Sequence, residues 1–245
     1  NTLSVKVHLV TSLINVEKDI ETCFKKLGIR ITNFVLEPLA SSHSVLDQNE
    51  KDMGVVLIDI GGGTTDIVLY HDGGIQHSSA ISLAGHNITL DISKIFKTSF
   101  DQAQDLKHDY GLSKKELAEQ TEIIEIDGVR GRESNTISQL DLAEVIEPRI
   151  TEILQLSNEK IKESGFKDKL NFGVVITGGG SQLKYIVDLA QEIFCMPVRI
   201  GFPELIGDNH DIYKDNPRYS TAIGIIQYAV ENYKDQNSIL DDNSS

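Results

Sequence analysis

Residues 59–66 read DIGGGTTD, and the segments on both sides of this stretch decide the fold. The apolar run VVLI at 55–58 precedes it, and the run IVLY at 67–70 follows it. A turn at 72–74 then leads into a third apolar segment, which ends at Leu83. A P-loop or a dinucleotide fingerprint would place a helix after its glycine loop, whereas a strand follows this one. The order therefore predicts a three-stranded meander whose first hairpin turn binds phosphate.

The first glycine turn carries the residue types that a phosphate site needs. Successive glycines can adopt φ > 0 and approach a ligand without a Cβ clash, and their N–H groups can converge on phosphate oxygens. Threonine hydroxyls can donate to a terminal phosphate, and flanking carboxylates suit a hydrated Mg²⁺ or an attacking water. The alternative is an ordinary glycine-rich hairpin with acidic ends. The predicted phosphate contacts are Gly61, Gly62, Gly63, Thr64 and Thr65; Asp59 and Asp66 are the candidate catalytic carboxylates, with Mg²⁺ held through water at Asp59.

A second glycine turn, TGGG at 177–180, follows an apolar strand and precedes a predicted helix. Ser181 is expected to cap that helix, and helix N-termini favour anions. The turn can therefore lie against a nucleoside and its inner phosphates, although close packing of a helix on a strand explains the same glycines. We expect Gly178, Gly179 and Gly180 to bind the nucleotide together with the first turn.

A helix expected from about Ser99 to Tyr110 carries a third group of candidates. Gln104 and Lys107 are three residues apart and share one helix face. Such a pair can hold ribose hydroxyls or the edge of a base, although by chemistry alone a solvated helix face is the better interpretation. The helix falls within residues 91–170, a predicted insert, so a nucleotide would lie in the cleft between the insert and the meander.

Composition narrows the possible functions. The 245 residues include 37 Asp and Glu against 23 Lys and Arg, a formal net charge of −14. This charge disfavours general nucleic-acid binding and adsorption to anionic lipid, and no apolar run is long enough to span a bilayer. Cys23 and Cys195 stand far apart in apolar surroundings and are expected to be buried, reduced thiols. The sequence begins with Asn1 and runs almost directly into a strand predicted at 5–11, so we expect part of a longer protein. Further along the chain we expect a strand at 31–36, a turn at 127–128 and a long helix that begins at Ser138.

These motifs together resemble the superfamily of actin, heat-shock chaperones and sugar kinases, and within it the FtsA family of bacterial cell-division proteins. The superfamily's second phosphate loop matches residues 59–66, and its adenosine loop matches VVITGGG at 174–180. The segments ISLAGHNITLDI at 81–92 and LAEVIEPR at 142–149 are similar to the FtsA family itself. One departure is AQDLK at 103–107, where the family has Glu in place of Gln104, so an acceptor remains but its charge is lost.

The resemblance implies an α/β fold, the second lobe of an actin-like (ribonuclease-H-like) structure with an inserted α+β subdomain. The family's first phosphate loop would precede residue 1, and its membrane-binding helix would follow residue 245. The implied domains are residues 1–50 as a remnant of first-lobe subdomain IA, 51–90 and 171–216 as subdomain IIA, 91–170 as the inserted subdomain IIB, 217–234 as a closing helix, and 235–245 as a disordered tail.

The resemblance also implies a function. It indicates a cell-division protein that binds ATP and Mg²⁺, polymerises, and tethers the FtsZ ring to the inner face of the cytoplasmic membrane at the division site, with weak ATPase activity at most. The implied partners are the FtsZ C-terminal tail, docked on the helix with Arg149 and Glu152, further copies of itself, and the membrane, but no nucleic acid. The alternatives are another actin-like scaffold, of the MreB or pilus-assembly type, or a chaperone-type or sugar-kinase-type ATPase.

Overall fold

The computed structural model describes residues 3, 7–11, 14–119, 121–126, 134–204, 213 and 215–242. The chain divides into two compact units, residues 1–36 and 37–245. In the first unit, α1 (Ile14–Lys26) has no buried side chain. Strands expected at 5–11 and 31–36 are not formed in the described residues of this unit, since a strand needs a hydrogen-bonded neighbour.

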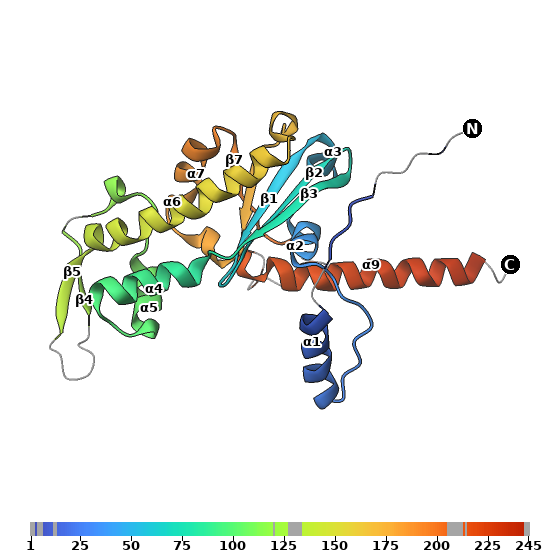
Figure 1. Cartoon of the computed structure of the whole chain (residues 1–245), viewed down its shortest axis with the longest axis horizontal. Coiled ribbons are helices and arrows are strands. Elements are labelled where there is room, and N and C mark those ends of the chain that lie inside the picture. The colour runs from blue at the N-terminus through green and yellow to red at the C-terminus, as the bar shows by residue number, and fades with distance from the viewer. Residues whose placement is uncertain are drawn as a thin grey trace. The chain divides into compact units, whose positions relative to one another are not determined.

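A five-stranded sheet with the order β3-β2-β1-β6-β7 organises the second unit (Figure 1). Strands β1 (Val55–Ile60), β2 (Thr65–His71) and β3 (Gly74–Ile81) form the antiparallel meander that the sequence predicts. Strand β6 (Val174–Thr177) pairs parallel to β1, and β7 (Val198–Ile200) pairs parallel to β6. Every residue of β1 is buried. Both faces of the sheet are therefore covered at β1, which explains its unbroken apolar run at 55–58.

The side chains of β1 alternate between two apolar clusters. Val56, Ile58 and Ile60 belong to the larger cluster, which α4, α6 and α7 help to form. Val55 and Leu57 belong to a smaller cluster near the end of α2. The alternation follows from the two-residue period of a strand, and it places the end of β1 between two packed layers.

The insert between β3 and β6 is mixed α and β, as predicted. Helix α6 crosses one side of the sheet in Figure 1, with α4, α5 and the small hairpin at one end. Ser99 and Ser138 accept backbone N–H bonds at the starts of α5 and α6 and so act as the N-caps. The turn expected at 127–128 lies outside the described residues. The elements are α4 (Gly85–Phe96), α5 (Phe100–Tyr110), η1 (Lys115–Leu117), β4 (Ile123–Ile126), β5 (Asn135–Ser138), α6 (Gln139–Glu163) and η2 (Lys167–Lys169).

Helix α2 (Glu37–Val45) covers the other side of the sheet, where it contacts β1 and β2. Helix α2 packs against α9, and they approach so closely that a Cβ on Gly224 would lie 1.8 Å from the Ala40 carbonyl oxygen. Helix α9 continues past the end expected at 234, through residues expected to lack structure. Their polar sequence lacks the apolar periodicity by which helices are recognised. The remaining elements are α2 (Glu37–Val45), α3 (Gln48–Met53), η3 (Gly179–Gln182), α7 (Ile186–Phe194), η4 (Pro217–Tyr219) and α9 (Ser220–Asp242).

The expectation of buried thiols is wrong, because Cys23 and Cys195 are both exposed. Cys23 lies on α1, where no side chain is buried. Cys195 ends α7 in the left-handed conformation, with φ of 54°, so it leaves the helix face that its apolar neighbours bury. Within the described residues, no helix is long and apolar enough to cross a membrane.

Candidate functional site

The first glycine turn joins β1 to β2 and is open on one side. The Gly61 N–H donates to the Thr64 carbonyl over 3.0 Å and closes the turn. A Cβ built on Gly62 or Gly63 would meet no atom within 4 Å. None of the three glycines adopts the left-handed φ that the sequence suggests. Their small size therefore matters for access, because a phosphate can approach the backbone here without meeting a side chain.

The start of α4 holds this turn in place. The Gly85 N–H donates to the Gly61 carbonyl over 3.1 Å, and the His86 N–H donates to the Gly62 carbonyl over 2.8 Å. These bonds link the insert directly to the turn. A movement of α4 would therefore displace the turn.

The two predicted catalytic carboxylates face each other across the hairpin, where Asp59 pairs with Asp66. Asp59 is only 4% exposed. One of its oxygens, Oδ2, accepts from Ser41 Oγ on α2 and, at 3.3 Å, from Thr221 Oγ1 on α9. Asp66 Oδ2 accepts from Thr64 Oγ1 over 3.0 Å. Helices from far along the chain therefore hold Asp59, while Asp66 is held from within the turn.

A third carboxylate, Glu37 at the start of α2, joins this group. Burial raises the pKa of Asp59 and of Asp66. Partial desolvation raises the pKa of Glu37, and the charges of Asp66 and Asp59 raise it further. The sequence does not predict Glu37 at this site, because only the packing of α2 brings it near Asp59 and Asp66. A divalent cation would relieve this crowding of negative charge.

The carboxylates do not form a direct metal site. Among the described residues, no group of three or more His, Cys, Asp or Glu side chains is placed to hold a metal ion. Mg²⁺ commonly keeps several waters and is bound through one or two carboxylates and substrate phosphates. The donor set around Asp59 and Asp66 therefore fits a hydrated Mg²⁺ that arrives with a nucleotide.

Thr65, the other predicted threonine, is fully buried. Its hydroxyl donates to the Leu83 carbonyl over 2.8 Å and ties β2 to the end of the meander. This position argues against a phosphate contact for Thr65. The sequence does not show which of two adjacent threonines is buried, so it offers no signal that separates Thr65 from Thr64.

The second glycine turn packs directly on the end of β1. Gly178 has φ of 82°, and a Cβ there would lie 2.2 Å from Asp59 Oδ1. A Cβ on Gly180 would lie 2.3 Å from the Ile60 side chain. Close packing, the alternative interpretation, therefore accounts for these two glycines. Their packing also brings the second turn to the first.

No α-helix starts at this second turn. The Ser181 hydroxyl donates to the Gly178 carbonyl over 2.7 Å, within a short 3₁₀ segment. Helix α7 begins only at Ile186, preceded by Tyr185 in the left-handed conformation. The expected cap at Ser181, and the helix N-terminus expected to favour a phosphate there, are both wrong. The local motif TGGGS fits a 3₁₀ turn equally well.

Lys107 extends from α5 to the start of α4, which is hydrogen-bonded to the first turn. Its Nζ donates to the Gly85 carbonyl over 3.0 Å and to Thr89 Oγ1 over 2.7 Å. Burial lowers the pKa of Lys107 to about 8, and the positive charge of Arg218 contributes to this shift. Gln104 is half-buried on the same helix. A cation that remains uncompensated and partly desolvated is well suited to an anionic ligand.

Arg218, in η4, is a second cation that the sequence analysis missed. A Cβ on Gly179 would lie 3.5 Å from Arg218 Cγ, so this side chain lies against the second glycine turn. Burial is the largest cause of the lowered pKa values of Lys107 and His108, and the positive charge of Arg218 lowers both further. The sequence gives no hint of this proximity, since η4 follows the turn only after β7. Lys107 from the insert therefore lies at the start of α4, beside the first turn, and Arg218 from η4 lies against the second turn.

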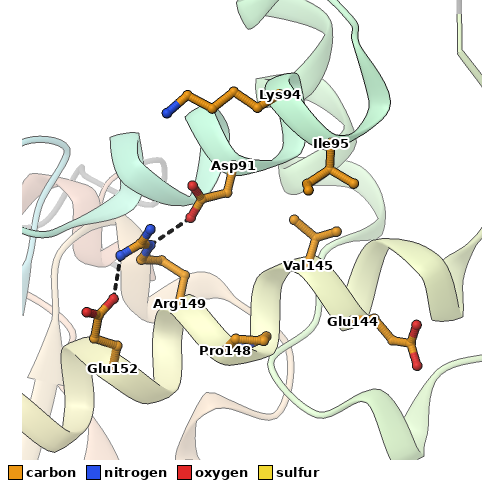
Figure 2. Close-up of a pocket in the computed structure, with 8 residues that line it drawn as sticks. All are labelled: Asp91, Lys94, Ile95, Glu144, Val145, Pro148, Arg149 and Glu152. Atoms are coloured by element: carbon orange, nitrogen blue, oxygen red, sulfur yellow. Dashed lines mark hydrogen bonds and ion pairs between the residues drawn. The ribbon is translucent and has the colours of Figure 1, made fainter.

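The predicted partner-binding residues border a separate groove between α4 and α6, shown in Figure 2. Arg149 Nε donates to Asp91 Oδ2 over 2.6 Å, and Arg149 Nη1 donates to Glu152. Arg149 and Glu152 are thus brought together as an ion pair. The groove has a volume of about 560 Å³, and its lining residues are Asp91, Lys94, Ile95, Glu144, Val145, Pro148, Arg149 and Glu152.

A family model described as cell division protein FtsA matches residues 56–224. The chain belongs to the FtsA family. It is 39% identical to FtsA of Pseudomonas aeruginosa over 243 residues, which cover 99% of this chain and 58% of that protein. It is 37% identical to FtsA of Escherichia coli K12, covering 94% and 56%, and 35% identical to FtsA of Bacillus subtilis, covering 96% and 52%. The chain therefore spans a little over half the length of these FtsA relatives.

Solved structures show the same fold at lower sequence identity. MreB5 of Spiroplasma citri bound to AMPPNP superimposes with a TM-score of 0.75 at 21% identity, over 93% of this chain and 68% of that one. A PilM–PilN type IV pilus biogenesis complex gives a TM-score of 0.63 at 18% identity, over 85% and 56%. The predicted actin-like α/β fold is confirmed. The FtsA family, rather than the MreB or pilus-assembly type, is the one that the sequence supports.

Proposed function

We propose that this chain carries the second-lobe half of the ATP site of an FtsA-type cell-division protein. In this proposal the whole protein polymerises and tethers the FtsZ ring to the inner face of the cytoplasmic membrane at the division site. The observation that carries the nucleotide part is the open backbone at Gly62 and Gly63, flanked by carboxylates and by Lys107.

Each part of the proposed ATP site has a separate task. The N–H groups of the first turn and the Thr64 hydroxyl donate to the phosphate oxygens. Lys107 and Arg218 stabilise the negative charge of the ligand from two sides. Two MreB5 structures with this fold are described as bound to ADP and to AMPPNP, which supports a nucleotide as the ligand.

Bound Mg²⁺ would neutralise phosphate charge and order its own waters. Asp59 is held rigidly by Ser41 and Thr221, which suits it to orient a metal-bound water. Asp66 and Glu37 keep more contact with solvent and can orient a water that attacks the terminal phosphate. With these carboxylates alone we expect weak ATP hydrolysis at most.

The proposal can be tested with Gly62→Ala and Gly63→Ala. Each added methyl group meets no protein atom within 4 Å, so the fold should be unchanged. The methyl groups would occupy the space proposed for phosphate, and the double variant should lose about tenfold or more in affinity for a fluorescent ATP analogue with Mg²⁺, ~1.4 kcal/mol.

Gly74→Ala is the matched control, because its methyl group also fits and lies in the next turn. Equal nucleotide affinity in the double variant, in Gly74→Ala and in the unaltered protein would contradict the proposed site. Thermal melting of all three should agree within a few degrees, as expected for substitutions without clashes.

The groove between α4 and α6 is the proposed docking site for the FtsZ C-terminal tail. Recognition of a short peptide requires an accessible apolar surface and a few placed charges. The groove offers both, since Ile95 is 62% exposed and charged side chains surround it. Binding of a labelled FtsZ-tail peptide, followed by fluorescence anisotropy, tests this docking directly.

A further inference from the structure

The start of α4 carries a histidine beside the open glycine turn. The His86 N–H donates to the Gly62 carbonyl over 2.8 Å. Asn87 Oδ1 accepts from the Ala84 N–H over 3.0 Å, an interaction that fixes the first turn of a helix. Backbone bonds therefore set the position of His86 relative to the glycine turn, and its side chain takes no part in them.

The His86 ring packs against Phe100, the first residue of α5. The two ring centroids are 4.6 Å apart, and the ring planes are inclined by 39°. Phe100 is half-buried, whereas His86 is exposed. Neither ring nitrogen of His86 forms a hydrogen bond or an ion pair with any residue that the structure describes. The ring is thus held by an apolar contact while its polar atoms have no protein partner among those residues.

The face of α5 that carries Phe100 is the one proposed to meet the nucleotide. Phe100, Gln104 and Lys107 occur at positions i, i+4 and i+7, so they share one helix face, and all three are half-buried. Helix α4 packs beside α5 (Figure 1). Lys107 donates to the carbonyl of Gly85, the residue before His86. This face of α5 therefore borders the start of α4 at both of its ends.

An imidazole at this position can bind phosphate. It carries an N–H donor in either tautomer, and a hydrogen bond to a charged phosphate oxygen is stronger than one between neutral groups. The backbone at Gly62 and Gly63 is open to a ligand. A phosphate there lies within reach of His86, because the His86 backbone is itself bonded to Gly62.

We propose that His86 donates its imidazole N–H to an outer phosphate of the nucleotide, and that Phe100 is a positioning residue that holds the imidazole ring. This inference rests on the proposed nucleotide site. It adds a donor from the insert to those that the first turn supplies. The ligand class that uses this donor is a nucleoside diphosphate or triphosphate, since a monophosphate has no outer phosphate.

The first experiment compares nucleotides of different phosphate length on the full chain. Competition against a fluorescent ATP analogue, with Mg²⁺ present, gives the dissociation constants of ATP, ADP and AMP. His86→Leu should raise the dissociation constants of ATP and ADP at least tenfold, while that of AMP stays within twofold. Its thermal melting should match that of the unaltered chain, because the side chain is exposed.

Two conservative variants test whether a donor is what the site requires. His86→Asn and His86→Gln place an amide N–H near the positions of Nδ1 and Nε2. One of them should bind ATP within threefold of the unaltered chain. Affinities as low as that of His86→Leu in both variants would overturn the proposed hydrogen bond.

The second experiment tests the positioning role of Phe100. Phe100→Leu should raise the dissociation constant of ATP at least threefold. Added to His86→Leu it should cause no further loss, because the ring that it positions is already absent. The matched control is Phe96→Leu, which removes another half-buried phenyl ring at the end of α4 and should leave ATP binding unchanged.

The remaining outcomes separate this inference from the proposed site. Failure of the unaltered chain to bind ATP overturns both. ATP binding that falls in the double variant of Gly62 and Gly63 but not in His86→Leu overturns only the role of His86. Equal losses for ATP and AMP in His86→Leu mean that His86 acts through the fold and overturn the phosphate contact. A further loss on adding Phe100→Leu to His86→Leu overturns the positioning role of Phe100.

Discussion

Nucleotide binding should weaken as the pH rises through the pKa of Lys107. Burial, together with the charge of Arg218, lowers this pKa from 10.5 to about 8. The protonated fraction of Lys107 therefore falls from about 0.9 at pH 7 to about 0.1 at pH 9. Only the protonated ammonium stabilises the bound phosphates. The apparent dissociation constant for ATP with Mg²⁺ should then rise about tenfold, equivalent to ~1.4 kcal/mol. Bound phosphate raises the pKa of Lys107, so binding near pH 8 should take up about half a proton per site.

Isothermal titration calorimetry at pH 7, 8 and 9, in buffers of different ionisation enthalpy, measures both the affinity and the proton uptake. Lys107→Arg should bind with the same affinity across this range, because a guanidinium stays protonated. Burial lowers the pKa of His108 from 6.5, so this imidazole remains neutral across the range. A constant dissociation constant in the unaltered protein, or the same pH dependence in Lys107→Arg, would refute the assignment to Lys107.

Two further substitutions test the packing of the two turns. In urea titrations, Gly178→Ala should reduce the free energy of unfolding by at least about 2 kcal/mol. The left-handed backbone alone disfavours a Cβ by ~1–2 kcal/mol, and the added methyl group would lie 2.2 Å from Asp59 Oδ1. A loss no larger than that of Gly74→Ala would contradict this prediction. Asp59→Asn should raise the Tm at pH 7, because burial raises the pKa of Asp59 and thereby disfavours the folded carboxylate above that pKa. The gain in Tm should vanish as the pH falls below 3.8, the pKa of Asp in the unfolded chain. At pH 7 the Mg²⁺-dependent affinity for the nucleotide should fall. A lower Tm of the variant at pH 7 would contradict the prediction, because it would mean that Ser41 and Thr221 stabilise the Asp59 carboxylate by more than burial disfavours it.

The meander and the main helices of the second unit could be predicted from the sequence because their signals are local. The uninterrupted apolar run of β1 and the glycine turn after it give a buried strand and a hairpin, whatever surrounds them. Ser99 and Ser138 begin their helices as expected, since a cap bonds to a backbone group only three residues away. The same reasoning fails at 31–36, where no strand forms without a neighbour.

The composition of the site could be predicted only in part. The sequence identifies the open turn and the carboxylates at its ends, because the types and spacing of these residues are local properties. It cannot separate Thr65, which donates to the Leu83 carbonyl, from Thr64, which lies in the turn. Nor can it place the start of α7, because TGGGS fits both a capped helix and the observed 3₁₀ turn.

Which side chains meet at the site depends on contacts between residues far apart in the chain. Glu37 reaches Asp59 and Asp66 only because α2 packs near the end of β1, and Arg218 reaches Lys107 only because η4 returns to the second turn. The sequence indicates only that Arg149 is a charge on an exposed helix face. In the structure, Arg149 donates a hydrogen bond to Asp91 of α4 across the groove. Local spacing determines which residues a turn or a helix face presents, whereas the packing of distant elements determines which of those residues already have partners.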